Sequence, residues 1–146
     1  MSKFIAVAGV ALLGLLILFL GREKSSSTYQ LSINGNVLFV EIADTVPLRE
    51  KGLGGRTHLD SNSGMLFVFE EPTVPSFWMK NMRFPIDIIW ISHEKQIIGV
   101  ETEVRPESYP QTFSPSAPVK YVLEVNGGWT EQNSVEIKGV VDIHYQ

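Results

Sequence analysis

The chain has 146 residues, of which the run Phe4–Leu20 is uncharged and the 119 residues from Thr28 to Gln146 remain for a folded unit. At roughly 100 to 200 residues per domain, this leaves one domain and excludes a doubly wound or barrel-shaped α/β enzyme. That unit carries nine basic and 15 acidic side chains, a net charge of −6 with no Lys/Arg cluster, which argues against a nucleic-acid partner. The absence of cysteine excludes disulfides, thiolate chemistry and Cys-ligated metals.

The N-terminal segment has the pattern of a signal peptide or signal anchor. Lys3 precedes the apolar run Phe4–Leu20, and a charged stretch follows at residues 22–24. As a helix the run would span roughly 25 Å, near the lower limit for crossing a bilayer core. We therefore expect a single-pass segment at the cell membrane.

The position of small residues decides whether a signal peptidase would cleave this segment. Ser25 and Ser27 are the nearest small residues suited to cleavage, and they lie well past the apolar run. We therefore expect residues 1–27 to be an uncleaved anchor with a short Ser-rich tether, and residues 28–146 to be a domain outside the cytoplasm. Secretion after signal cleavage is the alternative.

The domain is expected to begin with a β-hairpin and a short helix. Tyr29–Ile33 and Val37–Ile42 alternate apolar and polar residues around Asn34-Gly35, a pair that readily adopts the positive φ angles of a tight turn. Asp44-Thr45 ahead of a proline then predicts a capped helix over Leu48–Leu53, ended by two glycines.

The rest of the domain is predicted to be mainly β. A proline-rich excursion, Arg105–Pro118, is expected as ordered coil, and a single helical turn is expected near Trp129–Asn133. Short strands with frequent turns indicate a compact antiparallel β-sandwich or barrel-like roll with one short helix. The further predicted strands are Met65–Phe69, Phe77–Asn81, Ile86–Ile91, Gln96–Val104, Lys120–Val125 and Gly139–His144.

The segment Phe77–Asn81 carries bulky groups on both faces of its predicted strand. Phe77 and Met79 would face one side, with Trp78 and Lys80 on the other. One interpretation places Trp78 and Lys80 in a ligand groove, Trp as a stacking surface and Lys as a donor. The other leaves Trp78 as a cap on the core with the Lys80 stem laid over it.

Two carboxylates lie inside apolar strands, Asp87 and Glu124. Such groups are rarely buried without a partner, so each is expected to meet a backbone donor or a cation such as Arg49, Arg56 or Lys80. If the two carboxylates converged, they could instead act as an acid–base pair in hydrolysis of an envelope polymer.

The sequence contains no motif for a metal site, a serine hydrolase or a phosphate-binding loop. The three histidines, His58, His93 and His144, share no metal-ligand spacing. Ser114 and Ser116 lie outside any nucleophile-elbow motif, and the glycines at 52–55 end a helix where a phosphate loop would begin one. We expect no metal and no cofactor.

The sequence contains, in order, Arg49-x-x-Gly52-Leu53-x-x-Arg56, Gly64–Phe69, Phe77–Asn81, Pro85–Ile88 and Tyr121–Glu124. Taken together, these blocks resemble the domain of unknown function 192 family. The resemblance spans about Asn36 to Val141 and implies a compact β-sandwich or roll in a bacterial or archaeal protein; no activity carries over with it. Many members have a Pro-Cys element where this chain has Arg105-Pro106-Glu107, so a thiol role there does not apply. The residues that match the family pattern are Arg49, Arg56, Trp78, Lys80, Asn81, Asp87 and Glu124.

The leading hypothesis is a membrane-tethered extracytoplasmic module that binds a small-molecule, glycan or protein ligand through the face bearing Trp78, Lys80 and Asp87. The hydrolase with paired carboxylates is one alternative. A purely structural or protein-interaction domain is the other, in which Asp87 holds the fold.

Overall fold

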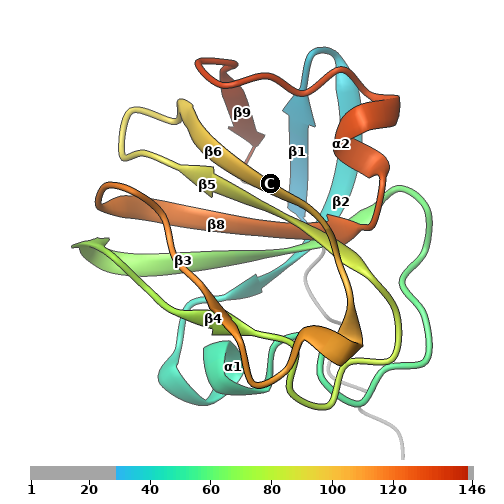
Figure 1. Ribbon diagram of the computed structural model, residues 1–146. Helices are drawn as coiled ribbons and strands as arrows, with labels where there is room; N and C mark the ends of the chain where they lie inside the picture. Colours follow the sequence, from blue (N-terminus) through green and yellow to red (C-terminus); the bar gives the residue numbers. More distant parts are fainter. Residues whose placement is uncertain (1–28, 145–146) are drawn as a thin grey trace, which may run out of the picture.

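The computed structural model describes residues 29–144, which form a curled β-sheet with short helices packed against it (Figure 1). No helix within residues 29–144 is long and apolar enough to cross a membrane. The predicted anchor and tether, residues 1–27, lie outside the described residues. The mainly β fold is confirmed, and of the two predicted architectures the barrel-like roll describes the curled sheet.

Seven strands form the main sheet, and two short strands form a separate ribbon. The order across the sheet is β6-β5-β8-β3-β2-β1-β9, and the ribbon is β4-β7. Of the helical elements, α1 is Val46–Lys51, α2 is Trp129–Gln132 and the 3-10 turn η2 is Pro106–Ser108. The strands are β1 Tyr29–Ile33, β2 Asn36–Ala43, β3 Ser63–Thr73, β4 Phe77–Trp78, β5 Ile86–Ile91, β6 Ile97–Val104, β7 Thr112–Phe113, β8 Val119–Asn126 and β9 Val141–His144.

The expectation of a wholly antiparallel sheet is wrong at one pair, because β2 and β3 run parallel. A parallel pair needs a crossover connection, and here that connection contains α1 and the loop after it. The other neighbouring strands of the sheet are antiparallel, including the predicted hairpin β1-β2. The helix predicted after Thr45 is therefore part of the segment that returns the chain to run parallel to β2.

Both faces of the central strands are covered, which explains why all six residues of β5 are buried. Ile89 and Leu123 belong to a core enclosed by the curl of β1, β2 and β9 and by Trp129 of α2. Ile88 and Val122 point the other way, into a second core that includes Leu53 after α1 and Phe77 of β4. The side chains of β5, and of Tyr121–Val125 in β8, thus alternate between the two faces that carry these cores.

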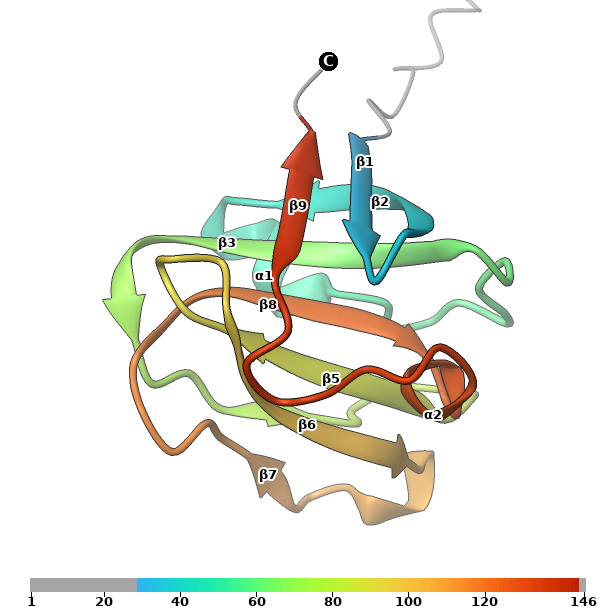
Figure 2. The same cartoon turned by 90° about the horizontal axis from the view of Figure 1, so that it is seen from above.

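The sheet curls far enough for its two ends to meet at one corner (Figure 2). Ile97 at the start of β6 accepts from the N–H of Lys138 and donates to the carbonyl of Gly139, at 2.7 and 2.9 Å. The N–H of Val141 at the start of β9 reaches the carbonyl of Lys95 at 2.9 Å. These bonds fix the curvature of the roll, because they join the outermost strands.

Candidate functional site

Helix α1 begins and ends two residues earlier than predicted. The Thr45 hydroxyl accepts from the N–H of Leu48 at 3.4 Å, so the helix starts at Val46 with its proline in the first turn. Gly52 ends it with φ 48° and ψ −138°, a conformation that disfavours other residues. Arg49 then fastens the helix to the sheet, donating through Nη1 to the carbonyls of Asp44 at 2.6 Å and Val68 at 2.9 Å.

The predicted strand Phe77–Asn81 forms a strand only over Phe77–Trp78, which pairs with β7. Asn81 has φ 61°, and its carbonyl accepts from the N–H of Gly55 at 2.9 Å, so the chain turns there against the loop after α1. The predicted alternation of side chains between two faces nevertheless holds at residues 78–80. Met79 is buried in the second core, whereas Trp78 is 51% exposed and Lys80 is exposed.

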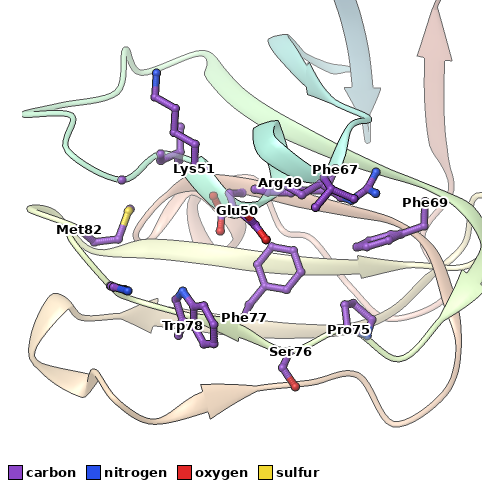
Figure 3. Close-up of a pocket in the computed structure, with 16 residues that line it drawn as sticks. Arg49, Glu50, Lys51, Phe67, Phe69, Pro75, Ser76, Phe77, Trp78 and Met82 are labelled. Atoms are coloured by element: carbon purple, nitrogen blue, oxygen red, sulfur yellow. The ribbon is translucent and has the colours of Figure 1, made fainter.

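A pocket of about 260 Å³ lies between α1, the sheet and the segment around β4, and we call it the Glu124 pocket (Figure 3). Aromatic and aliphatic side chains dominate its walls, as in most small-molecule sites, although its volume is at the small end of their range. Its lining residues are Val46, Arg49, Glu50, Lys51, Gly52, Leu53, Gly54, Phe67, Phe69, Pro75, Ser76, Phe77, Trp78, Lys80, Met82 and Glu124.

Aromatic rings fix the shape of the pocket. Phe67 of β3 meets Phe77 edge to face at a centroid distance of 4.8 Å, and Phe77 meets the buried ring of Trp90 in the same manner at 5.5 Å. The Arg49 guanidinium lies over the Phe69 ring, 5.2 Å from its centroid. Since Phe67 and Trp90 are held in the sheet, the wall formed by Phe77 is rigid.

Glu124 supplies a buried carboxyl group to the apolar pocket. Its side chain is on β8 between Met65 of β3 and Ile88 of β5, and the residue is 6% exposed. Its Oε2 atom is buried and has no hydrogen-bond partner among residues 29–144. Burial raises the pKa of Glu124 to about 8, and the charge of Arg56 opposes that rise only in part.

Arg56 does not neutralise Glu124 because it is engaged elsewhere. Its guanidinium forms a two-pronged pair with Glu41 of β2, with distances of 2.5 and 2.9 Å. That hydrogen bond holds the pKa of Glu41 below its ordinary value. Glu41, Met65 and Glu124 follow one another across β2, β3 and β8, so Arg56 sits near both acids and pairs with one. Within the described part of the chain, the expected ion pair of Glu124 is therefore absent.

Asp87 has the opposite environment, although it is also fully buried. Its Oδ1 accepts from the N–H groups of Glu103 at 2.8 Å and Gly128 at 3.0 Å. Its Oδ2 accepts from the N–H of Thr130 at 2.9 Å and from the Thr130 hydroxyl at 2.6 Å. The expected backbone donors are confirmed for Asp87.

These four bonds explain why a carboxylate is needed at that position. The β5-β6 register shifts around Asp87, which leaves the N–H of Glu103 outside the ladder, with Glu103 at φ 51°. Helix α2 starts at Gly128, which has no capping side chain of its own. Asp87 of β5 therefore accepts hydrogen bonds from the N–H groups at the start of α2 and also from the N–H of Glu103 that the bulge leaves unpaired.

The two acids cannot act as a catalytic pair. Asp87 is opposite Val125 and Glu124 is opposite Ile88 in the β5-β8 register, so the acids project from opposite faces of the sheet. Asp87 is also sealed beneath α2. The hydrolase with paired carboxylates is wrong for this geometry, and so is the grouping of Asp87 with Trp78 and Lys80 on one face.

The predicted residues therefore separate into four groups. Arg49, Trp78, Lys80 and Glu124 line the Glu124 pocket, whereas Arg56 supports it from behind and Asp87 belongs to the other core. Asn81 borders a second groove of about 650 Å³, which shares Trp78 and Lys80 with the pocket. The groove is lined by Glu50, Lys51, Gly54, Gly55, Trp78, Lys80, Asn81, Met82 and Arg83.

Sequence reasoning missed the aromatic wall and the exposed acid of α1. Phe67 and Phe69 alternate along β3 with residues of the enclosed core, a pattern that could have assigned them to the α1 face. Glu50 gave no signal, because its place depends on how α1 lies against β4. Among residues 29–144, no group of three His, Cys, Asp or Glu is placed to hold a metal.

Comparison with known proteins gives a family and a fold. A family model described as DUF192, "Uncharacterized ACR, COG1430", matches residues 29–143. A crystal structure of a candidate transcription regulator from Sinorhizobium meliloti 1021 is similar, with a TM-score of 0.77 and 29% identity over 83% of this chain and 97% of that one. A protein of unknown function from Novosphingobium aromaticivorans DSM 12444 matches with a TM-score of 0.73 and 27% identity, over 79% and 83%. No curated protein gives a significant match.

Proposed function

The chain belongs to the DUF192 family, whose description gives no activity, and we propose from the site itself that the domain binds a small organic molecule in the Glu124 pocket. The observation that carries this proposal is the buried Glu124 Oε2, which lines an aromatic pocket and has no partner. Buried polar groups are almost always hydrogen-bonded. A ligand atom would supply the missing bond.

The energetic argument favours a ligand over a structural role. A carboxyl whose pKa rises to about 8 destabilises the folded state at neutral pH, since its ionised form is kept out of water without compensation. Val or Leu would fill the same place in the second core without that penalty. Retaining an acid there is explained if a bound molecule contacts it.

The side chains that line the Glu124 pocket are also suited to binding a small molecule. The exposed ring of Trp78 stands at the mouth, and Phe67, Phe69 and Phe77 form the interior (Figure 3). Aromatic walls with one or two convergent polar groups are typical of small-molecule sites. This supports the interpretation of Trp78 as a ligand surface over its interpretation as a cap on the core.

The proposal can be tested by ligand-observed NMR with a collection of small organic compounds and the full chain. We expect compounds that bind the wild-type protein and lose at least tenfold in affinity with Trp78→Ala. The variant should fold normally, because Trp78 is half exposed. Phe39→Ala is the matched control, since Phe39 is a similarly exposed aromatic outside the pocket. Equal losses in both variants, or no binding to wild type, would contradict the proposal.

We also propose that the domain is held at the outer side of a cell membrane by residues 1–27. The support is the uncharged run Phe4–Leu20 behind Lys3. Protease digestion of intact and permeabilised cells would test it, with cleavage of the domain expected in intact cells once any outer barrier is opened. Recovery of the full chain in the soluble cytoplasmic fraction would count against the proposal.

Transcription regulation, the role ascribed to the Sinorhizobium protein, is not part of the proposal. The net charge of −6 over residues 28–146 opposes association with phosphates.

A further inference from the structure

The charge around the Glu124 pocket is unevenly distributed, and this bears on what the pocket binds. The pocket and its adjoining groove carry four basic side chains and one exposed acid, Glu50. Figure 3 shows Lys51 pointing away from the aromatic side chains, so it adds little inside the pocket. The basic residues are Arg49, Lys51, Lys80 and Arg83.

Lys80 and Arg49 are available to a ligand. Among residues 29–144, neither forms an ion pair with a carboxylate. Lys80 is exposed and lies where the pocket opens into the groove. Arg49 uses one nitrogen, Nη1, for both of its carbonyl contacts, which leaves the other donors of its fork for an anion.

The inner part of the pocket is suited to an uncharged hydrogen bond. Glu124 in its neutral form offers an O–H donor. No fixed charge from the strands on either side faces it, because its cross-strand neighbours are Met65 and Ile88. Arg56 is held by Glu41. The remaining charged groups around the pocket are Arg49, Glu50 and Lys51 of α1 and Lys80 after β4.

We infer that the ligand class is a small organic acid, with an aromatic or apolar body in the Glu124 pocket, a hydrogen-bond acceptor meeting the Glu124 hydroxyl, and an anionic group at the mouth near Lys80. This inference rests on the proposed function and adds its chemistry. A cationic ligand is disfavoured, since the pocket is lined by three basic side chains, Arg49, Lys51 and Lys80, against one exposed acid, Glu50. An ionised Glu124 would also repel an anionic ligand, so the protein binds this ligand with Glu124 protonated.

The test uses three probes of one shape and different charge: 4-methoxyphenylacetate, 2-(4-methoxyphenyl)ethanol and 2-(4-methoxyphenyl)ethylamine. With the full chain at pH 6, calorimetry should rank the carboxylate first, the alcohol second and the amine last. Lys80→Gln should weaken the carboxylate about tenfold and leave the alcohol within about twofold. Lys138→Gln, an exposed lysine far along the chain and outside both cavities, is the matched control.

The pH dependence supplies a second readout. Affinity for the carboxylate probe should fall about tenfold between pH 6 and pH 9, because the pKa of Glu124 is about 8 in the free protein and its ionised form cannot donate the hydrogen bond. Glu124→Gln keeps an N–H donor of the same shape, so it should bind within about threefold of wild type at pH 6 and lose this dependence.

Three outcomes would overturn the inference without overturning the proposed function. The first is tighter binding of the amine than of the carboxylate, and the second is affinity that rises with pH and disappears in Glu124→Gln. Either result would mean that the pocket binds a class of ligand other than small organic acids. If none of the three probes binds while other compounds do, the inference also fails; if no compound of the wider collection binds, the proposed function fails with it.

Discussion

Two buried carboxylates on adjacent strands have opposite environments in this domain. Asp87 of β5 receives four hydrogen bonds from three residues, and each of its oxygens is satisfied twice. Glu124 of β8 has an oxygen without a partner in the described part of the chain, and the neighbouring Arg56 is paired with another acid, Glu41. One carboxylate faces the core enclosed by the curl, and the other faces a pocket.

The contrast shows that burial of an acid does not by itself indicate function. Asp87 supplies what the backbone around it lacks, so the fold alone explains it. Glu124 makes no hydrogen bond through its buried Oε2 and lowers stability at neutral pH, so the fold does not explain it. The informative observation is whether neighbouring donors account for the charge.

The largest expected effect follows from removing Asp87. Asp87→Ala would leave the N–H groups of Glu103, Gly128 and Thr130 buried without acceptors, and should lower the free energy of unfolding by about 4 kcal/mol. Urea denaturation measures this, with Asp142→Ala on the exposed side of β9 as the control. A loss near zero would contradict the role assigned to Asp87.

The next largest effect concerns the pH dependence of stability. Glu124 is protonated in both states below pH 4.5; between pH 4.5 and about 8 the unfolded chain loses this proton and the folded one keeps it, so stability falls as pH rises. At about 1.4 kcal/mol per pH unit, the wild-type protein should lose roughly 3 kcal/mol relative to Glu124→Gln between pH 5 and pH 7.5. Parallel stability profiles for the two proteins would show that Glu124 titrates normally.

A smaller effect isolates one bond of Asp87. Thr130→Val keeps the size and shape of the side chain but removes the hydroxyl that lies 2.6 Å from Oδ2, while the backbone bond to the same oxygen remains. The free energy of unfolding should fall by about 1.5 kcal/mol, as for a hydrogen bond to a charged group. A loss as large as that of Asp87→Ala would mean that the valine disturbs α2 as a whole.

The smallest effect tests the sharing of Arg56. Glu41→Gln should free Arg56 to interact with Glu124, and the pKa of Glu124 should fall below about 8. The direct measurement is a carbon-detected NMR titration of the Glu124 carboxyl. We expect only about 1 kcal/mol of change in stability, because the Arg56–Glu41 pair is partly exposed. A Glu124 pKa that does not move would show that burial alone sets it.

Local patterns predicted most of the fold. The Asn34-Gly35 turn, the Thr45 cap and the alternation within β1 and β2 all involve residues close in sequence, and the structure has each of them. The parallel pairing of β2 with β3 was missed because a short helix between two strands is compatible with either direction. Phe77–Asn81 was predicted too long, since the positive φ of Asn81 is set by its contact with Gly55.

The site was predicted in its parts but not in its arrangement. Trp78, Lys80 and Glu124 were singled out, and they do line one pocket. Their separation from Asp87 depends on the β5-β8 register, and a shift of one residue would move Asp87 to the other face. The choice of Arg56 between Glu41 and Glu124 is likewise set by distances across three strands, which the sequence does not contain.

The pairing of β1 with β9 has a practical consequence for engineering the domain. Gln30 lies opposite His144, so the first and last described strands run side by side, with the start of one next to the end of the other. A short linker could join these strands and new ends could be opened in the exposed turn at His93 and Glu94, far along the chain from the pocket residues. Such a circular permutant would move the chain ends to the β5-β6 turn and leave the stretch Val46–Met82 of the Glu124 pocket unbroken.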